Sequence, residues 1–259
     1  MTERQVAVIT GAGRGLGRAI AERLARKGFH VVATDIDEGA ARVTGVMVDG
    51  TGLSQDVRDP ESHRQIAAAA RELGPITAWI NNAGVLAVGD SHRVGDDATR
   101  RMVEVNLLGV IWGCHAALDA MERGTILNIA SISALVPTPG LAVYGATKHG
   151  VLGYSLSLAG ELRRANRPIA VSTLLPDAMK GEMTDAVAHD AAASLLFSSG
   201  DLLAIPDVAD TAVELVEKPR LVRTLPAHRA ALIHLLRPFP ALGLPLLAQF
   251  ARRGRKHQR

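Results

Sequence analysis

The sequence predicts a doubly wound α/β fold, in which helices cover both faces of one parallel sheet. Short apolar segments with the length of strands alternate with longer helical patterns along most of the chain. These segments are apolar throughout rather than at every second residue, so both of their faces are expected to be buried. Strands that alternate with helices are typical of parallel sheets. We therefore expect one sheet of about seven strands.

The elements are predicted in a regular order. Residues 5–9 form the first strand, and a helix follows a glycine cluster over about residues 15–27, with Ile20 and Leu24 on one face. The later strands are expected over residues 30–34, 76–80, 125–130 and 169–174. The stretch 43–56 is ambiguous, because two short apolar runs flank the polar residues 49–52, and the third strand is not placed within it.

Length and composition favour a single folded domain. The chain has 259 residues, of which 47% are hydrophobic and 21% charged, and this balance excludes intrinsic disorder. No repeat or linker interrupts the sequence up to about residue 225. We expect one dinucleotide-binding catalytic domain over residues 1–225. Residues 226–259 are expected to form an apolar extension with a basic tail, either within that domain or as a lid or interface segment.

Cysteine content and charge bear on location and partners. Cys114 is the single cysteine, no signal peptide pattern opens the chain, and no run approaches the roughly 18 apolar residues of a membrane-spanning helix. We therefore expect a cytoplasmic protein. The net charge is only +3, and the basic residues gather at the C-terminus, where we interpret them as a solvated tail. No nucleic-acid partner is expected. The histidines lack paired metal-ligand spacing, and no metal site is predicted.

A glycine-rich turn joins the first strand to the first helix. It reads Thr10-Gly11-Ala12-Gly13-Arg14-Gly15-Leu16-Gly17. Residues without a Cβ let the backbone approach a pyrophosphate that is held at the helix N-terminus. Glycine-rich turns also simply connect elements, so the turn alone is weak evidence for a dinucleotide site.

Asp35 strengthens this interpretation and indicates which dinucleotide is bound. It ends the second strand, eighteen residues after Gly17, where a carboxylate accepts hydrogen bonds from ribose hydroxyls and repels a 2′-phosphate. Arg14 could attract that phosphate, but the like-charge clash with Asp35 is more direct. NAD is therefore favoured over NADP as the cofactor.

Tyr144 and Lys148 are candidates for proton transfer. They lie four residues apart at the start of a helical pattern, so their side chains share one face. A nearby ammonium favours the phenolate and lowers the pKa of the tyrosine toward neutrality. The spacing is common and gains meaning only from the polar residues that precede it. These are Asn81, Asn82, Asn106 and Ser131.

Taken in order, these motifs resemble the short-chain dehydrogenase/reductase family over residues 10 to about 219. The resemblance implies a Rossmann-type fold and a tyrosine-dependent hydride transfer between a nicotinamide cofactor and an alcohol or carbonyl. In the family, the residues matching Ser131 and Tyr144 hold the substrate oxygen, and the tyrosine acts as acid or base. The residue matching Lys148 binds the nicotinamide ribose and lowers the tyrosine pKa. The residue matching Asn106 holds a water that links the lysine to solvent.

The resemblance also implies the cofactor contacts and leaves one serine open. Asp56 and Val57 match the pair that contacts adenine. Ser131 is preferred to Ser133 because its spacing to Tyr144 fits the family, and Ser133 is an alternative substrate contact. The expected cofactor residues are Gly11, Gly13, Arg14, Gly15, Leu16, Gly17, Asp35, Ile36, Asp56, Val57, Asn82, Ala83, Gly84, Tyr144, Lys148, Pro176 and Met179.

One stretch departs from the family pattern. After the sixth strand the family has Pro-Gly, then a hydrophobic residue and a threonine, which contact the nicotinamide carboxamide and the diphosphate. In this chain Asp177 replaces the glycine and Gly181 replaces the threonine. Met179 is expected to keep its backbone contact with the carboxamide. The threonine contact is expected to be lost or taken over by Thr184.

The substrate is expected to be hydrophobic, such as a steroid, a long-chain alcohol or a cyclic alcohol. Family members shape the pocket with the segment matching residues 179–205. Here that segment contains the apolar residues Met183, Val187, Leu195, Leu196 and Phe197, which form a lid or simply pack as a surface helix.

The C-terminal extension is rich in large apolar residues, which need a partner. It can pack over the substrate opening, join the interface of a homodimer or homotetramer, or make a peripheral membrane contact through residues 227–259. The residues concerned are Leu232, Ile233, Leu235, Leu236, Phe239, Leu242, Leu244, Leu246, Leu247 and Phe250.

These observations predict an NAD-dependent oxidoreductase that interconverts a secondary alcohol and a ketone, with Tyr144 as the acid or base. A catalytically inactive dinucleotide-binding sensor or scaffold is the first alternative, because the fold permits either. A lyase or isomerase reaction on the same scaffold is the second.

Overall fold

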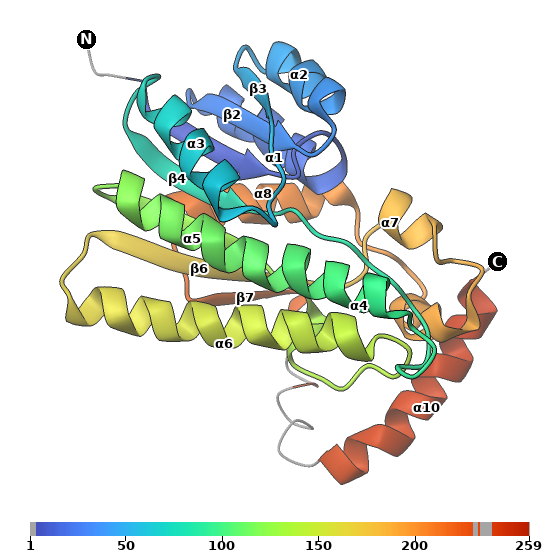
Figure 1. Ribbon diagram of the computed structural model, residues 1–259. Helices are drawn as coiled ribbons and strands as arrows, with labels where there is room; N and C mark the ends of the chain where they lie inside the picture. Colours follow the sequence, from blue (N-terminus) through green and yellow to red (C-terminus); the bar gives the residue numbers. More distant parts are fainter. Residues whose placement is uncertain (1–3, 230–232, 234–239, 259) are drawn as a thin grey trace.

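A computed structural model describes residues 4–229, 233 and 240–258. Within these residues the core is a sheet of seven parallel strands in the order β3-β2-β1-β4-β5-β6-β7 (Figure 1). The doubly wound parallel sheet predicted from the apolar strands is thereby confirmed. The strands are β1 (Val6–Thr10), β2 (His30–Asp35), β3 (Thr51–Ser54), β4 (Ile76–Asn81), β5 (Gly124–Ile129), β6 (Ile169–Pro176) and β7 (Val222–Leu225).

Helices cover both faces of the sheet because each strand points alternate side chains to opposite sides. Val6 and Val8 pack with α3, α5 and α6 on one face, whereas Ala7 and Ile9 pack with α1 and α8 on the other (Figure 1). The helices are α1 (Gly15–Arg26), α2 (Glu38–Met47), α3 (Pro60–Arg71), α4 (Asp96–Val103), α5 (Gly109–Ala120), α6 (Ala142–Arg164), α7 (Glu182–Asp185), α8 (Ile205–Glu217) and α10 (Pro240–His257), with short turns η1 (Glu104–Leu108), η2 (Ile132–Ala134) and η3 (Ala191–Phe197).

The ambiguous stretch 43–56 holds the end of α2 and the whole of β3. Asp49 has a positive φ of 48° and turns the chain between them. The helix and strand then lie very close, since a Cβ built on Gly45 would be 2.5 Å from the backbone nitrogen of Gly52. β3 is an edge strand and is only partly buried, so its sequence lacks the apolar run that marks the inner strands.

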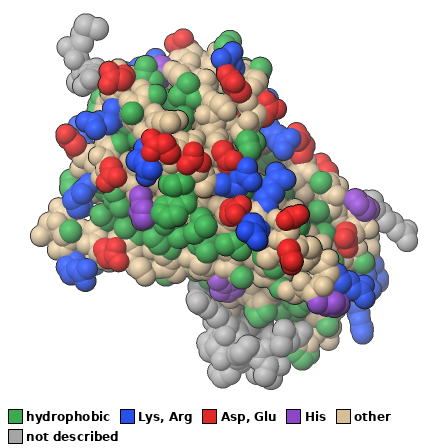
Figure 2. Space-filling view, in the orientation of Figure 1, with side chains coloured by type: hydrophobic (Ala, Val, Ile, Leu, Met, Phe, Trp, Pro, Cys, Tyr) green, Lys and Arg blue, Asp and Glu red, His purple; other side chains and the backbone are tan. Residues whose placement is uncertain are grey.

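The outward face of α5 and α6 is apolar. Figure 2 shows hydrophobic side chains gathered over these two helices, with charged side chains mostly around them. Leu156 on α6 is exposed, and Trp112 on α5 is half-buried.

The C-terminal helix α10 packs against η3. A Cβ built on Gly254 would lie 1.7 Å from the carbonyl oxygen of Ser194, so glycine is required where the two segments meet. Beyond that contact the Gln258 side chain donates to the Asp190 carbonyl at 2.7 Å. Four of the apolar residues predicted to need a partner, Leu232, Leu235, Leu236 and Phe239, lie outside the described residues, as do the side chains of Leu242, Leu244 and Leu246. Among the helices that are described, none is long and apolar enough to cross a membrane.

Candidate active site

A cavity of about 1830 Å³ runs along the carboxyl ends of the strands. It begins at the glycine-rich turn between β1 and α1, passes the ends of β2, β4, β5 and β6, and reaches Phe250 on α10. The carboxyl ends of parallel strands meet at one edge of the sheet, and the strand order reverses between β1 and β4, where such folds open a crevice. The cavity therefore lies where the topology predicts a ligand.

The glycine-rich turn forms a cradle at the start of α1. Gly11 has a φ of +63°, and a Cβ on it would lie 2.8 Å from the Cα of Ala83. Gly15 has a φ of +56°, lines the cavity, and has no heavy atom within 4 Å of the position of its missing Cβ. An open space at a helix N-terminus, bordered by backbone N–H groups, fits the pyrophosphate of a dinucleotide.

Asp35 shapes this cradle as well as lining it. Its carboxylate accepts hydrogen bonds from the backbone N–H of Gly13 at 2.9 Å and of Asp37 at 3.1 Å. A Cβ on Gly13 would lie 2.8 Å from the carboxylate oxygen, and one on Gly17 would lie 2.2 Å from the carbonyl oxygen of Gly11. Gly13 and Gly17 do not line the cavity, so we assign them to the packing of the turn rather than to direct cofactor contact.

The other expected cofactor residues all border the cavity. They are Gly11, Arg14, Gly15, Leu16, Asp35, Ile36, Asp56, Val57, Asn82, Ala83, Gly84, Tyr144, Lys148, Pro176 and Met179. Asn82 also joins two strand ends, because its side-chain amide donates to the carbonyls of Thr10 and Gly11, both at 2.9 Å. The residues present therefore fit a dinucleotide.

A buried histidine, to which no sequence motif pointed, supports Val57, one of the residues expected to contact adenine. His63 is fully buried on α3, and its Nε2 lies 3.0 Å from the carbonyl oxygen of Val57. Because a carbonyl only accepts, Nε2 carries the proton, and Nδ1 accepts from the Gln55 amide at 3.0 Å. Burial lowers the pKa of His63 and keeps the ring neutral. Nearby, Arg58 donates a hydrogen bond to the Asp56 carboxylate, and this bond lowers the pKa of Asp56.

Ser131, Tyr144 and Lys148 meet at the centre of the cavity. Ser131 follows β5 and caps η2, whereas Tyr144 and Lys148 share the first turns of α6, as their spacing predicts. The Lys148 ammonium donates to the Ile129 carbonyl at 3.0 Å and lies 5.6 Å from the centre of the Tyr144 ring. The hydroxyl oxygen of Ser131 accepts from the backbone N–H of Ser133 at 3.2 Å.

Burial shifts the pKa values of this pair in opposite directions. Desolvation disfavours the phenolate and raises the pKa of Tyr144 to about 12, although its hydrogen bond with Ser131 acts the other way. Desolvation disfavours the ammonium and lowers the pKa of Lys148 to about 8. The sequence predicts a lowered tyrosine pKa, whereas in the protein alone burial raises this pKa and the hydrogen bond with Ser131 offsets the rise only in part. At neutral pH the site holds a phenol beside an ammonium.

Asn106 lies behind this group rather than on the cavity wall. It is fully buried in the π-helical turn η1, a feature that is frequent at functional sites. Its side chain accepts from the N–H of Val85 and donates to the carbonyl of Val85, both at 2.8 Å. It therefore holds the loop after β4 in place, next to the expected cofactor residue Gly84.

The loop after β6, whose sequence departs from the family pattern, is held by contacts of its own side chains. The Thr184 hydroxyl lines the cavity but donates to the carbonyls of Met179 and Gly181, at 2.6 and 2.8 Å, so its proton is already engaged. Glu182 forms an ion pair with Arg14 across the cavity mouth. Asp177 is buried and forms an ion pair with Arg229, which follows β7. No sequence signal pointed to Arg229.

The apolar lid and the C-terminal extension both contribute to the far end of the cavity. Met183, Leu195 and Leu196 border it from the segment after β6. Ile233, Leu247 and Phe250 border it from the extension. Of the three alternatives for the extension, packing over the substrate opening is the one that these contacts support.

Comparisons with known proteins agree with this geometry. Residues 5–192 match the family described as short chain dehydrogenase. The 3-oxoacyl-[acyl-carrier-protein] reductase of Salmonella typhimurium is 36% identical over 200 residues, which span 75% of this chain and 81% of the relative. The diacetyl reductase [(S)-acetoin forming] of Staphylococcus epidermidis is 33% identical over 193 residues, spanning 71% and 74%.

Solved structures show the same likeness. A short chain dehydrogenase/reductase from Burkholderia phymatum in complex with NAD superimposes with a TM-score of 0.84 and 28% identity, covering 94% of this chain and 97% of that one. A 3-ketoacyl-(acyl-carrier-protein) reductase from Brucella melitensis complexed with NADH gives a TM-score of 0.77 and 27% identity, covering 87% and 98%. The chain belongs to the short-chain dehydrogenase/reductase family of oxidoreductases.

The open space at Gly15 allows a test of the cradle. The substitution Gly15→Ala places a methyl group where the pyrophosphate is expected, so we expect the Kd for NADH, measured by its fluorescence, to rise at least about tenfold. The matched control is Gly28→Ala, because Gly28 also has a positive φ of +92° and an open Cβ position but lies outside the cavity. Both substitutions impose backbone strain of about 1–2 kcal/mol, because an alanine takes a positive φ in each. Only Gly15→Ala should weaken the binding of NADH. Equal NADH affinity in the two variants would place the dinucleotide elsewhere.

Proposed function

We propose that this protein is an NAD-dependent oxidoreductase that interconverts a secondary alcohol and a ketone, with Tyr144 as the acid or base. The observation that supports the proposal most directly is the convergence of Ser131, Tyr144 and Lys148 on one wall of a cavity that continues into the glycine cradle. A bound nicotinamide dinucleotide would supply or accept the hydride at the substrate carbon. The side chains of the protein transfer the proton and stabilise the charge that develops.

In the direction of reduction, the Tyr144 hydroxyl donates a proton to the substrate carbonyl oxygen. Its raised pKa keeps the proton on the tyrosine at neutral pH, so the acid is present before the reaction starts. The Ser131 hydroxyl oxygen accepts from Ser133, and its hydrogen, which bonds to Tyr144 in the protein alone, is donated to the same substrate oxygen when the substrate binds. In the direction of oxidation these transfers run in reverse.

Lys148 stabilises the phenolate that Tyr144 becomes after it has given up its proton. The ammonium is held by the Ile129 carbonyl and is buried beside the half-buried tyrosine, so water screens the attraction only weakly. Asn106 acts indirectly, because it positions the loop at Val85 and Gly84 beside the Lys148 ammonium.

The preference for NAD rests on Asp35. Its carboxylate lines the cavity and is anchored by Gly13, where it would accept hydrogen bonds from ribose hydroxyls and repel a 2′-phosphate. The exposed Arg14 is already paired with Glu182, which weakens its attraction for a phosphate. The complexes of the relatives from Burkholderia phymatum and Brucella melitensis with NAD and NADH support the same choice.

Apolar side chains border the far end of the cavity, and we propose a hydrophobic alcohol or ketone as the substrate. The apolar outward face of α5 and α6 supports a homodimer or homotetramer (Figure 2), which stays a prediction. The cytoplasmic location, a peripheral membrane contact of residues 227–259 and the domain boundary near residue 225 also stay predictions. The altered loop after β6 keeps open the alternative of an inactive dinucleotide sensor, whereas the intact Ser131, Tyr144 and Lys148 argue against it.

The central test measures the absorbance of reduced cofactor with a panel of secondary alcohols and ketones. We expect turnover by the native protein and a loss of about 10²–10⁴-fold in kcat for Tyr144→Phe, because the proton donor is removed. The matched control is Tyr154→Phe, since Tyr154 is the other tyrosine and does not line the cavity. Unchanged turnover in Tyr144→Phe would contradict the mechanism. NADH binding without turnover of any compound would favour the sensor.

The lowered pKa of Lys148 predicts a pH dependence. As pH rises through about 8 the ammonium loses its proton, whereas Tyr144, with a pKa of about 12, keeps its own. We therefore expect kcat/KM for ketone reduction to fall on the alkaline side of about pH 8. The residual activity of Lys148→Met should lack this decline. A decline that persists in Lys148→Met would have to come from another group.

The role of Asp35 is tested with Asp35→Asn, which removes the charge and keeps an oxygen for the Gly13 N–H. We expect the ratio of kcat/KM with NADP to kcat/KM with NAD to rise at least about tenfold, because the clash with the 2′-phosphate is relieved. Asp37→Asn is the control, since Asp37 caps α2 two residues further on and does not line the cavity. A native preference for NADP, or an unchanged ratio in Asp35→Asn, would show that Asp35 does not select the cofactor.

A further inference from the structure

A charged pair lies at the substrate end of the cavity, where the chain departs from its family. Asp177 follows β6 directly, and its backbone N–H donates to the carbonyl of Leu225, the last residue of β7, at 2.8 Å. Arg229 lies four residues beyond β7 and reaches back to the Asp177 carboxylate. Because β5, β6 and β7 are neighbours in the sheet, this pair and Ser131, which follows β5, belong to the same edge.

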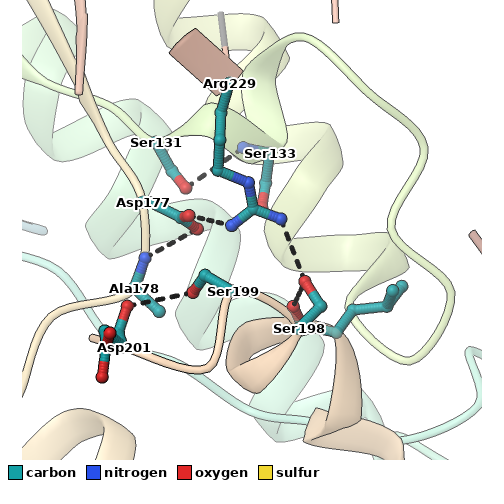
Figure 3. Close-up of polar contacts among 9 residues, drawn as sticks. Ser131, Ser133, Asp177, Ala178, Ser198, Ser199, Asp201 and Arg229 are labelled. Carbon is teal, nitrogen blue, oxygen red and sulfur yellow. Dashed lines mark hydrogen bonds and ion pairs between the residues drawn. The ribbon is translucent and has the colours of Figure 1, made fainter. Parts of the chain in front are cut away.

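Both members of the pair are held in place by further contacts (Figure 3). The second carboxylate oxygen of Asp177 accepts from the backbone N–H of Ala178 at 2.9 Å. The guanidinium of Arg229 also donates to the Ser198 hydroxyl at 3.0 Å, and that hydroxyl donates to the Leu195 carbonyl at 2.7 Å. The side chains of Asp177 and Arg229 are only 8% and 23% exposed. These contacts therefore fix the positions of both side chains.

The pair borders the cavity and retains hydrogen-bonding capacity. A guanidinium carries five N–H donors and no acceptor. Among the described residues, side-chain contacts to Asp177 and Ser198 engage one N–H at each of two nitrogens, and Arg229 borders the cavity. Placing two charges away from bulk water is costly, and replacing such a pair with apolar side chains is often neutral or stabilising. A pair kept at this place is thus better explained by a ligand contact than by stability alone.

The surroundings define what the pair can bind. The cavity that the pair borders has both apolar and polar lining. Its apolar residues include Leu135, Val136, Leu195, Ile233, Leu247 and Phe250, and the polar residues Ser198, Ser199 and His228 line it as well. A ligand with an apolar body and a polar group fits such a lining. The charges of Asp177 and Arg229 cancel, so an anionic group attracted by the guanidinium would be repelled by the carboxylate beside it. A neutral oxygen gains the hydrogen bond without that repulsion.

We propose that Asp177 and Arg229 form a specificity site for a second, neutral oxygen of the substrate, a carbonyl or hydroxyl group apart from the one that reacts at Tyr144. The substrate class is then an apolar alcohol or ketone that carries a further oxygen function. This inference rests on the proposed function, which places the reacting oxygen at Ser131 and Tyr144. It assigns a role to Arg229 and to the aspartate that stands in place of the family's glycine.

The test compares ligands that differ only in a second carbonyl. The first pair is propiophenone and phenylpropanedione, a diketone whose two carbonyls are adjacent. The second pair is valerophenone and the diketone that carries a second carbonyl two carbons further along the same chain. Each is titrated by calorimetry into the protein saturated with NAD, so that a ketone binds without being reduced. For at least one pair we expect the diketone to bind the native protein at least about tenfold more tightly, the worth of one good hydrogen bond in a buried site.

The variant Asp177→Asn/Arg229→Gln neutralises both partners together, so no buried charge is left unpaired. We expect its preference for the diketone to fall below about threefold. Arg229→Lys, which keeps the charge and loses the planar fork, should lose most of the preference as well. The matched control is Arg23→Gln/Asp210→Asn, because that ion pair joins α1 to α8 outside the cavity and should leave the preference intact.

Two results would overturn the inference. One is the absence of a preference for either diketone in the native protein, including failure of all four compounds to bind. The other is a preference that survives in the Asp177→Asn/Arg229→Gln and Arg229→Lys variants, since the pair would then only join the C-terminal segment to the loop after β6. A preference in binding without turnover of any ketone would support the specificity site and overturn the proposed reaction. Turnover of a ketone without any preference for the diketone would support the proposed reaction and overturn the specificity site.

Discussion

The close approach of β1 and β4 is the constraint on which the site depends. Here the order of strands reverses, and the Asn82 side chain bonds to the carbonyls of Thr10 and Gly11. Gly11 leaves no room for a Cβ against Ala83, so the two strand ends can close up only with glycine at this position. Successive connections then leave to opposite sides, and the crevice between them becomes the cavity. The glycine cradle and the group of Ser131, Tyr144 and Lys148 both border that cavity.

Three sets of hydrogen bonds hold the proposed catalytic residues and the loop beside them in position. Lys148 is anchored by the Ile129 carbonyl, Ser131 by the Ser133 N–H, and the loop after β4 by the buried amide of Asn106. This arrangement leaves the reactive atoms of Ser131 and Tyr144 for the substrate. The same burial that fixes them also shifts the pKa values of Tyr144 and Lys148 in opposite directions, so a phenol and an ammonium coexist at neutral pH.

The C-terminal segment contributes part of the wall of the cavity. α10 packs against η3 through the close contact at Gly254, and Leu247 and Phe250 border the cavity. Arg229 adds a charge that pairs with Asp177 on the loop after β6. The ion pair therefore joins the altered loop after β6 to the segment that follows β7.

The sequence alone determined the doubly wound sheet, the glycine cradle and the Tyr144–Lys148 pair, since apolar strands, glycine spacing and helical periodicity are local patterns. It missed the position of β3, because an edge strand is half-exposed and carries a weak apolar signal. Only the tertiary structure decided that Gly13 and Gly17 support the turn without lining the cavity, that His63 underlies Val57, and that Arg229 meets Asp177. Such contacts join residues far apart in the chain, and burial, which raises the pKa of Tyr144, is a property of the packed molecule.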